Sequence, residues 1–146
     1  MFSNIVVGTD GSDTATLAVT VAADLAKQHG AVIHLVNAYK VSTGGVAVVH
    51  AGATAVADHA ASGEVLRGVS EKLLTEVAHT IRGIDVKTRA VVGSPADVLI
   101  MIAEEVGADL IVVGSKGMRG ARRVLGSVPN TIAHRAPCHV LIAKTT

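Results

Sequence analysis

Short runs of β-branched and other apolar residues alternate with helical segments along this chain, and that alternation limits the fold more than any other feature. Between the runs, apolar residues recur every three or four positions, which is typical of helices. The runs are expected to be strands over 4–8, 31–38, 84–92, 110–113 and 137–142. Because neighbouring parallel strands need a crossover, the order β-α-β-loop-α-β-α-β-α-β predicts an α/β fold with a parallel sheet covered by helices on both faces.

The first two predicted helices are flanked by residue types that commonly begin or end helices. The first is expected between the turn at 9–13 and Gly30, and the second between the capping residue Ser62 and Gly83. The expected buried stripe of the second helix is Leu66, Val69, Leu73, Val77 and Ile81.

The third helix has a strong start signal in the sequence S-P-A-D, with Ser94 suited to the N-cap and Pro95 to the first helical position. This helix is expected to end at Gly107. A short fourth helix is expected over 127–136, with Pro129 in its first turn.

The segment 39–61 has no clear period and is rich in Gly, Ala, Ser and Thr. We expect it to be a long mobile loop with a partly helical end. A loop of this length is unusual in a compact domain and is either functional or disordered. The length of 146 residues predicts a single domain, 1–146, that buries a core of its own.

Charge is distributed unevenly, although the net charge is only +1. No acidic residue follows Asp109, whereas six basic residues do, which leaves seven basic against twelve acidic residues in the rest of the chain. A protein for long polyanions would be basic overall, so this pattern favours a local anion site. Phe2 and Tyr39 are the only aromatic residues, which argues against the stacking platforms of nucleic-acid binding.

Other classes are excluded by residue types and motifs. Cys138 is the single cysteine, so no internal disulfide forms, and the seven histidines lack the spacing of a metal cage. There is no G-x-x-x-x-G-K-[ST] or G-x-S-x-G motif, and no catalytic residue is assigned. The chain has no basic leader and no apolar run of bilayer length, so we expect a cytoplasmic protein with no membrane partner.

The ends of the first and fourth predicted strands, 8–12 and 114–120, are the most polar and glycine-rich. In an open parallel sheet of the Rossmann-like or flavodoxin-like type, ligands bind at the carboxyl ends of such strands, where the strand order reverses. The stretch from Gly114 to Ser127 reads G-S-K-G-M-R-G-A-R-R-V-L-G-S. Glycine N–H groups and the start of the following helix would hold phosphate there.

These segments resemble the universal stress protein family, in its nucleotide-binding branch. The chain reads I-V-V-G-T-D-G-S at the first strand, V-V-G-S-P-A-D after the third, and V-V-G-S-K-G-M-R-G after the fourth, followed by L-G-S-V and R-A-P-C-H-V-L-I. The resemblance covers essentially the whole chain. It implies an open five-stranded sheet of order 3-2-1-4-5 and a homodimer joined through the last strand, His139 to Ile142. It also implies binding of ATP, AMP or cyclic AMP, with magnesium carried by the nucleotide.

The resemblance also implies the residues of the site. The residues near adenine and ribose would be Gly8, Thr9, Asp10, Val36, Val113 and Gly114. The residues around the phosphates would be Gly117, Gly126, Ser127 and Val128. Charge and position in the loop add Lys116, Arg119 and Arg122, together with their loop neighbours Ser115, Met118 and Gly120.

The chain departs from the family pattern in the phosphate loop, because eight residues, and not nine, separate Gly117 from Gly126. We hypothesise that the grip on the β and γ phosphates is altered. A monophosphate or a cyclic nucleotide would then compete well with ATP.

Alternatives stay open for two residues and for the function. Asp10 is suited to cap the first helix, with Ser12 or Asp13 sharing that role, as well as to bind a ligand, and Ser127 suits an N-cap as well as a phosphate contact. The expected function is nucleotide binding as a sensor, buffer or switch read by an unidentified regulatory protein. The alternatives are a slow ATPase and a nucleotide-free module whose basic loop binds an acidic partner.

Overall fold

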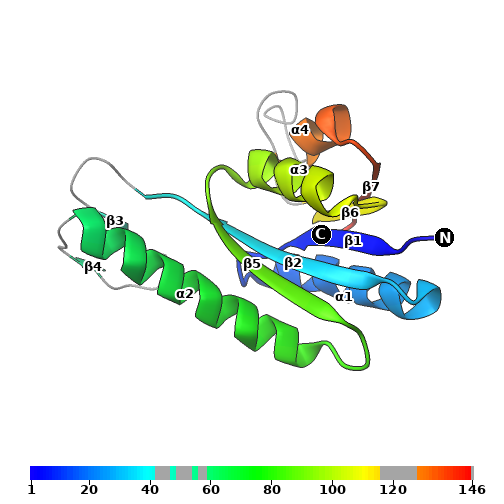
Figure 1. Ribbon diagram of the computed structural model, residues 1–146, viewed down its shortest axis with the longest axis horizontal. Coiled ribbons are helices and arrows are strands. Elements are labelled where there is room, and N and C mark those ends of the chain that lie inside the picture. Colours follow the sequence, from blue (N-terminus) through cyan, green and yellow to red (C-terminus); the bar gives the residue numbers. More distant parts are fainter. Residues whose placement is uncertain (42–46, 49–53, 56–58, 116–127, 146) are drawn as a thin grey trace.

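The computed structural model describes residues 1–41, 47–48, 54–55, 59–115 and 128–145 (Figure 1). Within these ranges, the main sheet has five parallel strands in the order β5-β2-β1-β6-β7. Their bounds are β1 Asn4–Gly8, β2 Val32–Tyr39, β5 Val86–Val92, β6 Leu110–Gly114 and β7 His139–Ala143. Numbered by their place in the chain, the strands have the predicted order 3-2-1-4-5, so the predicted fold class is confirmed.

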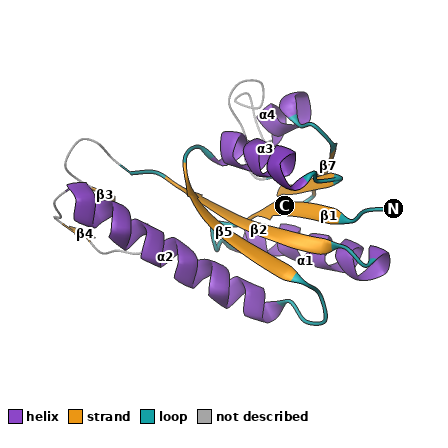
Figure 2. Ribbon diagram, viewed as in Figure 1, coloured by secondary structure: helices purple, strands orange, loops and turns teal. Residues whose placement is uncertain are grey.

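Helices cover both faces of this sheet (Figure 2). They are α1 Asp13–His29, α2 His59–Thr80, α3 Pro95–Val106 and α4 Val128–Arg135. Alternate strand residues point to opposite faces, so Ile5 and Val7 of β1 pack with α1 and α2 while Val6 packs with α3 and α4. In the described ranges, no helix is long and apolar enough to cross a membrane.

The segment 39–61 contains the last residue of β2, a small antiparallel pair and the start of α2. The pair is β3 Ala47–Val48 with β4 Thr54–Ala55. The remainder, 42–46, 49–53 and 56–58, lies outside the described residues, and the expected mobile loop stays a prediction. Helix α2 begins at His59, ahead of the expected cap Ser62. The two alanines before Ser62 are strong helix formers, which explains the earlier start.

The buried stripe of α2 differs from the predicted one at its centre. Val69 was expected to be buried but is 46% exposed, whereas Ser70 is 3% exposed and Leu74 is 1% exposed. The predicted stripe residues that are half-buried are Leu66, Leu73, Val77 and Ile81. A polar residue therefore takes the place that periodicity assigns to an apolar one, because its hydroxyl has a partner in the sheet, as shown below.

Two predicted helix starts are confirmed, with different capping chemistry. The Ser12 hydroxyl caps α1 by accepting a hydrogen bond from the backbone N–H of Ala15 at 3.2 Å. Ser94 is the N-cap residue of α3, but its hydroxyl donates to the carboxylate of Asp97 at 2.7 Å and makes no backbone cap. Ser12 therefore fills the capping role on α1 that the sequence left open among three residues.

Gly11, in the turn between β1 and α1, has a backbone that disfavours any side chain. Its φ of +78° lies in the left-handed region, and an added Cβ would lie 2.7 Å from Cδ1 of Leu73 in α2. The turn thus needs glycine both for its backbone conformation and for the close approach of α2.

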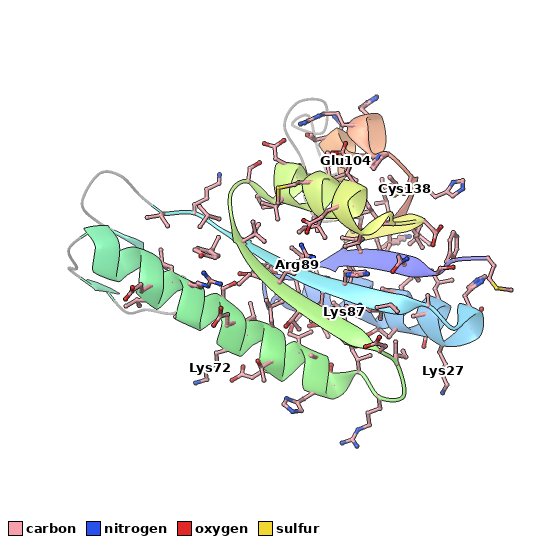
Figure 3. All side chains as sticks on the ribbon, viewed as in Figure 1. Lys27, Lys72, Lys87, Arg89, Glu104 and Cys138 are labelled. Carbon is pink, nitrogen blue, oxygen red and sulfur yellow. The ribbon has the colours of Figure 1, made fainter. Side chains whose placement is uncertain are left out.

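His34 is a buried titratable residue in β2, 4% exposed. Its Nε2 lies 3.0 Å from Oδ1 of Asn4 and donates to it, while its Nδ1 has no hydrogen-bond partner among the described residues. Burial lowers the pKa of His34, and the positive charges of Lys87 and Arg89 on neighbouring β5 lower it further, against a smaller opposing effect of Asp85 (Figure 3). The folded protein therefore favours the neutral imidazole.

Replacing Gly11 with alanine is expected to destabilise the fold more than the same change at Gly83. Gly83 has a φ of +73° but nothing within 4 Å of an added Cβ, so it isolates the backbone term. Left-handed alanine costs about 1–2 kcal/mol at either site, and displacement of the Leu73 side chain adds about 0.5–1.5 kcal/mol at Gly11. Urea denaturation of both variants measures the difference. Equal losses would show that α2 does not press on the turn.

The protein is expected to become less stable as the pH drops, because of His34. Its pKa is below the ordinary value of 6.5 in the folded state, so the unfolded state binds more protons as the pH drops below that value. The free energy of unfolding should therefore decrease from about pH 7 to about pH 5 more steeply in the wild type than in His34→Gln. His134→Gln is the matched variant, with the same substitution at an exposed position. A His34→Gln slope equal to that of the wild type would contradict a neutral, buried His34.

Candidate functional site

A pocket with a volume of about 280 Å³ opens at the carboxyl ends of β1, β2 and β6. The first turn of α1 borders it, as do the start of α3 and the start of α4. Its apolar lining residues are Ala15, Val36, Ala38, Pro95, Leu99, Val113, Val128 and Pro129. Its polar lining residues are Thr9, Asp10, Ser12, Thr14 and Asn37, with Gly8 and Gly114 completing the lining.

The described residues that were predicted for the site almost all meet at this pocket. Those that line it are Gly8, Thr9, Asp10, Val36, Val113, Gly114 and Val128. They come from three strands, the turn after β1 and the start of α4. The other predicted residues, Lys116, Gly117, Met118, Arg119, Gly120, Arg122, Gly126 and Ser127, lie outside the described residues and stay predictions.

Among the predicted site residues that the structure describes, Ser115 is the one that does not line the pocket. Its hydroxyl accepts a hydrogen bond from the backbone N–H of Thr145 at 3.0 Å and lies 3.2 Å from the hydroxyl of the same residue. Its own N–H donates to the carbonyl of Ala143 at 2.9 Å. Ser115, which directly follows β6, is thus hydrogen-bonded to the end of β7 and to Thr145 beyond it.

In the turn that carries Asp10, backbone N–H groups donate hydrogen bonds to side chains of the same turn. The hydroxyl of Thr9 accepts from the N–H of Gly11 at 3.1 Å, and Oδ1 of Asp10 accepts from the N–H of Ser12 at 2.9 Å. Thr9 is buried, and its own N–H donates to the carbonyl of Val36 at 2.9 Å. The turn is therefore tied to β2 while Asp10 itself is exposed at the pocket.

Asp10 is the only ionisable side chain among the described lining residues. Its carboxylate accepts hydrogen bonds, which suits hydroxyl or amine groups of a ligand. The first turn of α1 contributes Ser12, Thr14 and Ala15 to the lining, so the positive end of the helix dipole lies at the same pocket. The described pocket thus combines an apolar slot with a hydrogen-bonding rim.

Glycines at the ends of β1 and β6 let neighbouring side chains approach the backbone closely. A Cβ on Gly8 would lie 3.1 Å from Cδ1 of Leu99 in α3, and one on Gly114 would lie 3.1 Å from Cγ2 of Thr145. A side chain at either position would crowd the pocket wall or the base of the glycine-rich loop.

Sequence reasoning missed several lining residues: Ser12, Thr14, Ala15, Asn37, Ala38, Pro95, Leu99 and Pro129. For Asn37 a signal existed, because it is a polar residue in a mostly apolar strand, directly after the predicted Val36. Register places Val36 beside Gly8, so the next residues of β2 extend past the end of β1 and flank the pocket. Most of the other missed residues lie at or near the start of a helix. Apolar periodicity does not show which strand end the start of a helix will face.

Comparison with known proteins supports the family resemblance of the sequence along nearly the whole chain. The model of the universal stress protein family matches residues 1–144. A universal stress protein of Mycobacterium tuberculosis is 36% identical over 149 residues, covering 99% of this chain and 98% of the relative. A putative universal stress protein of Staphylococcus aureus is 35% identical over 147 residues, covering 99% of this chain and 85% of the relative.

Solved structures show the same fold. A universal stress protein crystallised in complex with cAMP superposes with a TM-score of 0.77 at 32% identity, covering 99% of this chain and 98% of the other. The M. tuberculosis protein Rv1636 superposes with a TM-score of 0.60 at 34% identity, covering 99% and 97%. On its sequence, its strand order and these relationships, the chain belongs to the universal stress protein family.

Proposed function

We propose that the pocket at the ends of β1, β2 and β6 binds an adenine nucleotide, and that the protein acts as a nucleotide-dependent sensor, buffer or switch. The observation that carries this proposal is the convergence of Gly8, Asp10, Val36 and Gly114 on one apolar slot with a polar rim. These residues were predicted for such a site from the sequence and the family resemblance. Gly8 and Gly114 end their strands, Asp10 lies in the turn after β1, and Val36 lies beside Gly8 in β2.

The chemistry of the lining fits a purine nucleoside. The walls contributed by Val36, Leu99 and Val113 are apolar, as a flat base requires, and the pocket lies at the sheet edge where this fold class binds ligands. The carboxylate of Asp10 can accept hydrogen bonds from ribose hydroxyls or from the amino group of adenine. Phosphates would extend toward the basic loop 116–127 and bring any magnesium with them.

A relative supports the same ligand class. The universal stress protein whose structure is a complex with cAMP shares 32% of its residues with this chain over nearly the full length of both. Cyclic AMP contains an adenine, a ribose and one phosphate. The apolar walls and the Asp10 carboxylate would suit the first two, and the basic residues predicted for the loop 116–127 would suit the phosphate.

Binding is a better proposal than turnover, because hydrolysis requires a positioned water and stabilisation of developing charge. Asp10 is the one ionisable group in the described lining, and it already accepts a hydrogen bond from the turn. A slow ATPase remains the alternative, and steady turnover that Asp10→Ala or Gly117→Ala removes would favour it.

Dimerisation through the last strand, a cytoplasmic location and a regulatory protein partner also belong to this proposal. In the described sheet, β7 is the terminal strand and pairs with β6 on its inner side. An edge strand of this kind is suited to pair with a second copy of the chain.

Removal of the Asp10 carboxylate is expected to weaken nucleotide binding. Hydrogen bonds to a charged group contribute enough that Asp10→Ala should raise the Kd of AMP at least about tenfold in isothermal titration calorimetry. Asp13→Ala is the matched control, because Asp13 is exposed in the first turn of α1 and does not line the pocket. Equal affinities of the two variants would remove Asp10 from the site, and no binding by the wild type would favour the nucleotide-free module.

The shortened phosphate loop is expected to limit the preference for ATP. With eight residues between Gly117 and Gly126, AMP and cyclic AMP should bind within about tenfold of ATP when the three are compared by calorimetry at one salt and magnesium concentration. A preference for ATP of about a hundredfold or more would show that the loop grips the β and γ phosphates fully.

A further inference from the structure

Helix α2 presents a hydroxyl to the sheet where its periodicity calls for an apolar side chain. Ser70 is 3% exposed, while the adjacent Val69 points outward and is 46% exposed. One turn later the helix buries Leu74, 1% exposed, in the ordinary way. A buried hydroxyl needs a hydrogen-bond partner, because leaving it unpaired is costly.

The partner of Ser70 is Asn37 of β2. The Ser70 hydroxyl donates to Oδ1 of Asn37 at 2.7 Å, and Nδ2 of Asn37 donates to the backbone carbonyl of Thr9 at 2.6 Å. A carbonyl can only accept, so this geometry fixes which end of the carboxamide faces the turn and which faces the helix. The hydrogen bonds form a relay from α2 through β2 to the end of β1.

The relay ends on the peptide unit that precedes Asp10. The Thr9 carbonyl and the Asp10 nitrogen belong to one planar group, so holding that carbonyl fixes the direction in which the chain enters Asp10. On its other side, Thr9 is held through its N–H by the carbonyl of Val36. Asn37 also lines the pocket itself, so it stands between the helix and the site.

We propose that Asn37 is a positioning residue of the pocket, and that Ser70 sets its orientation from α2. This proposal rests on the proposed nucleotide binding, and it adds a route by which that site is regulated. Because coupling between two places in a protein is reciprocal, loss of the Ser70–Asn37 hydrogen bond weakens nucleotide affinity, and a bound nucleotide stabilises that hydrogen bond.

A purely structural role is the competing explanation, in which Ser70 and Asn37 only satisfy each other inside the fold. Both explanations expect Ser70→Ala and Asn37→Ala to lower stability. Only the positioning role expects changes at the Asp10 turn and in ligand affinity that a similar loss of packing does not cause. Leu74→Val supplies that control, because it loosens α2 against the same sheet without touching Asn37.

The first measurement uses the ligand-free protein. The N–H groups of Gly11 and Ser12 are hydrogen-bonded to Thr9 and Asp10 within the turn, so their exchange with solvent deuterium, followed by NMR, reports the order of the turn. Exchange at both amides should be about fivefold to tenfold faster in Ser70→Ala and Asn37→Ala, and unchanged in Leu74→Val. Unchanged exchange in the two relay variants would overturn the positioning role, whether or not the protein binds nucleotide.

The second measurement is the affinity for AMP, by calorimetry at a temperature where all variants are fully folded. The Kd should rise about fivefold to tenfold in each relay variant and stay within about twofold of wild type in Leu74→Val. The double variant should bind no more weakly than Asn37→Ala alone, because Ser70 acts through Asn37. Wild-type affinity in both relay variants would overturn the proposal, whereas a wild type that binds no nucleotide would defeat the proposed function and leave the exchange test to decide the relay.

Discussion

Parallel pairing of β1 with β2 on one side and β6 on the other is the constraint on which the pocket depends. Gly8 lies beside Val36, and Val7 beside Val112, so β1 ends between two strands that continue past it. From β1 the chain crosses over one face to reach β2, while α3 crosses over the other face to reach β6. The two crossovers diverge, and a crevice opens between them at the carboxyl ends.

The cores on the two faces make this crevice a rigid platform. Residues of β1 are fully buried on both sides, with Ile5 and Val7 facing α1 and α2 and Val6 facing α3 and α4. Polar groups begin only where the strand ends, at Thr9 and Asp10. The side chains that we propose to bind a ligand therefore sit on backbone whose position is set by dense packing, and the turn itself needs only a few hydrogen bonds to be held in place.

The alternation of strands and helices was sufficient to predict the fold class, and the family resemblance gave the strand order. Strand ends could be located because apolar runs stop at glycine and polar residues. Gly8, Asp10 and Gly114 line one pocket, and their role in ligand binding stays a prediction. Periodicity could not show that Ser70 is buried and Val69 exposed. That choice depends on Asn37, which is 33 residues away in sequence and adjacent only in the folded protein. The basic loop 116–127 was predicted from charge and motif, and its role remains a prediction.

The central claim is that an adenine nucleotide occupies the crevice, and the most direct measurement is the identity of small molecules carried by the protein. Native mass spectrometry of the purified chain, followed by denaturation and analysis of what is released, detects them without assuming a ligand. We predict an adenine nucleotide, bound on isolation or acquired when AMP, cyclic AMP or ATP is added, and lost in Asp10→Ala. A chain that carries no nucleotide and acquires none of the three would contradict this account.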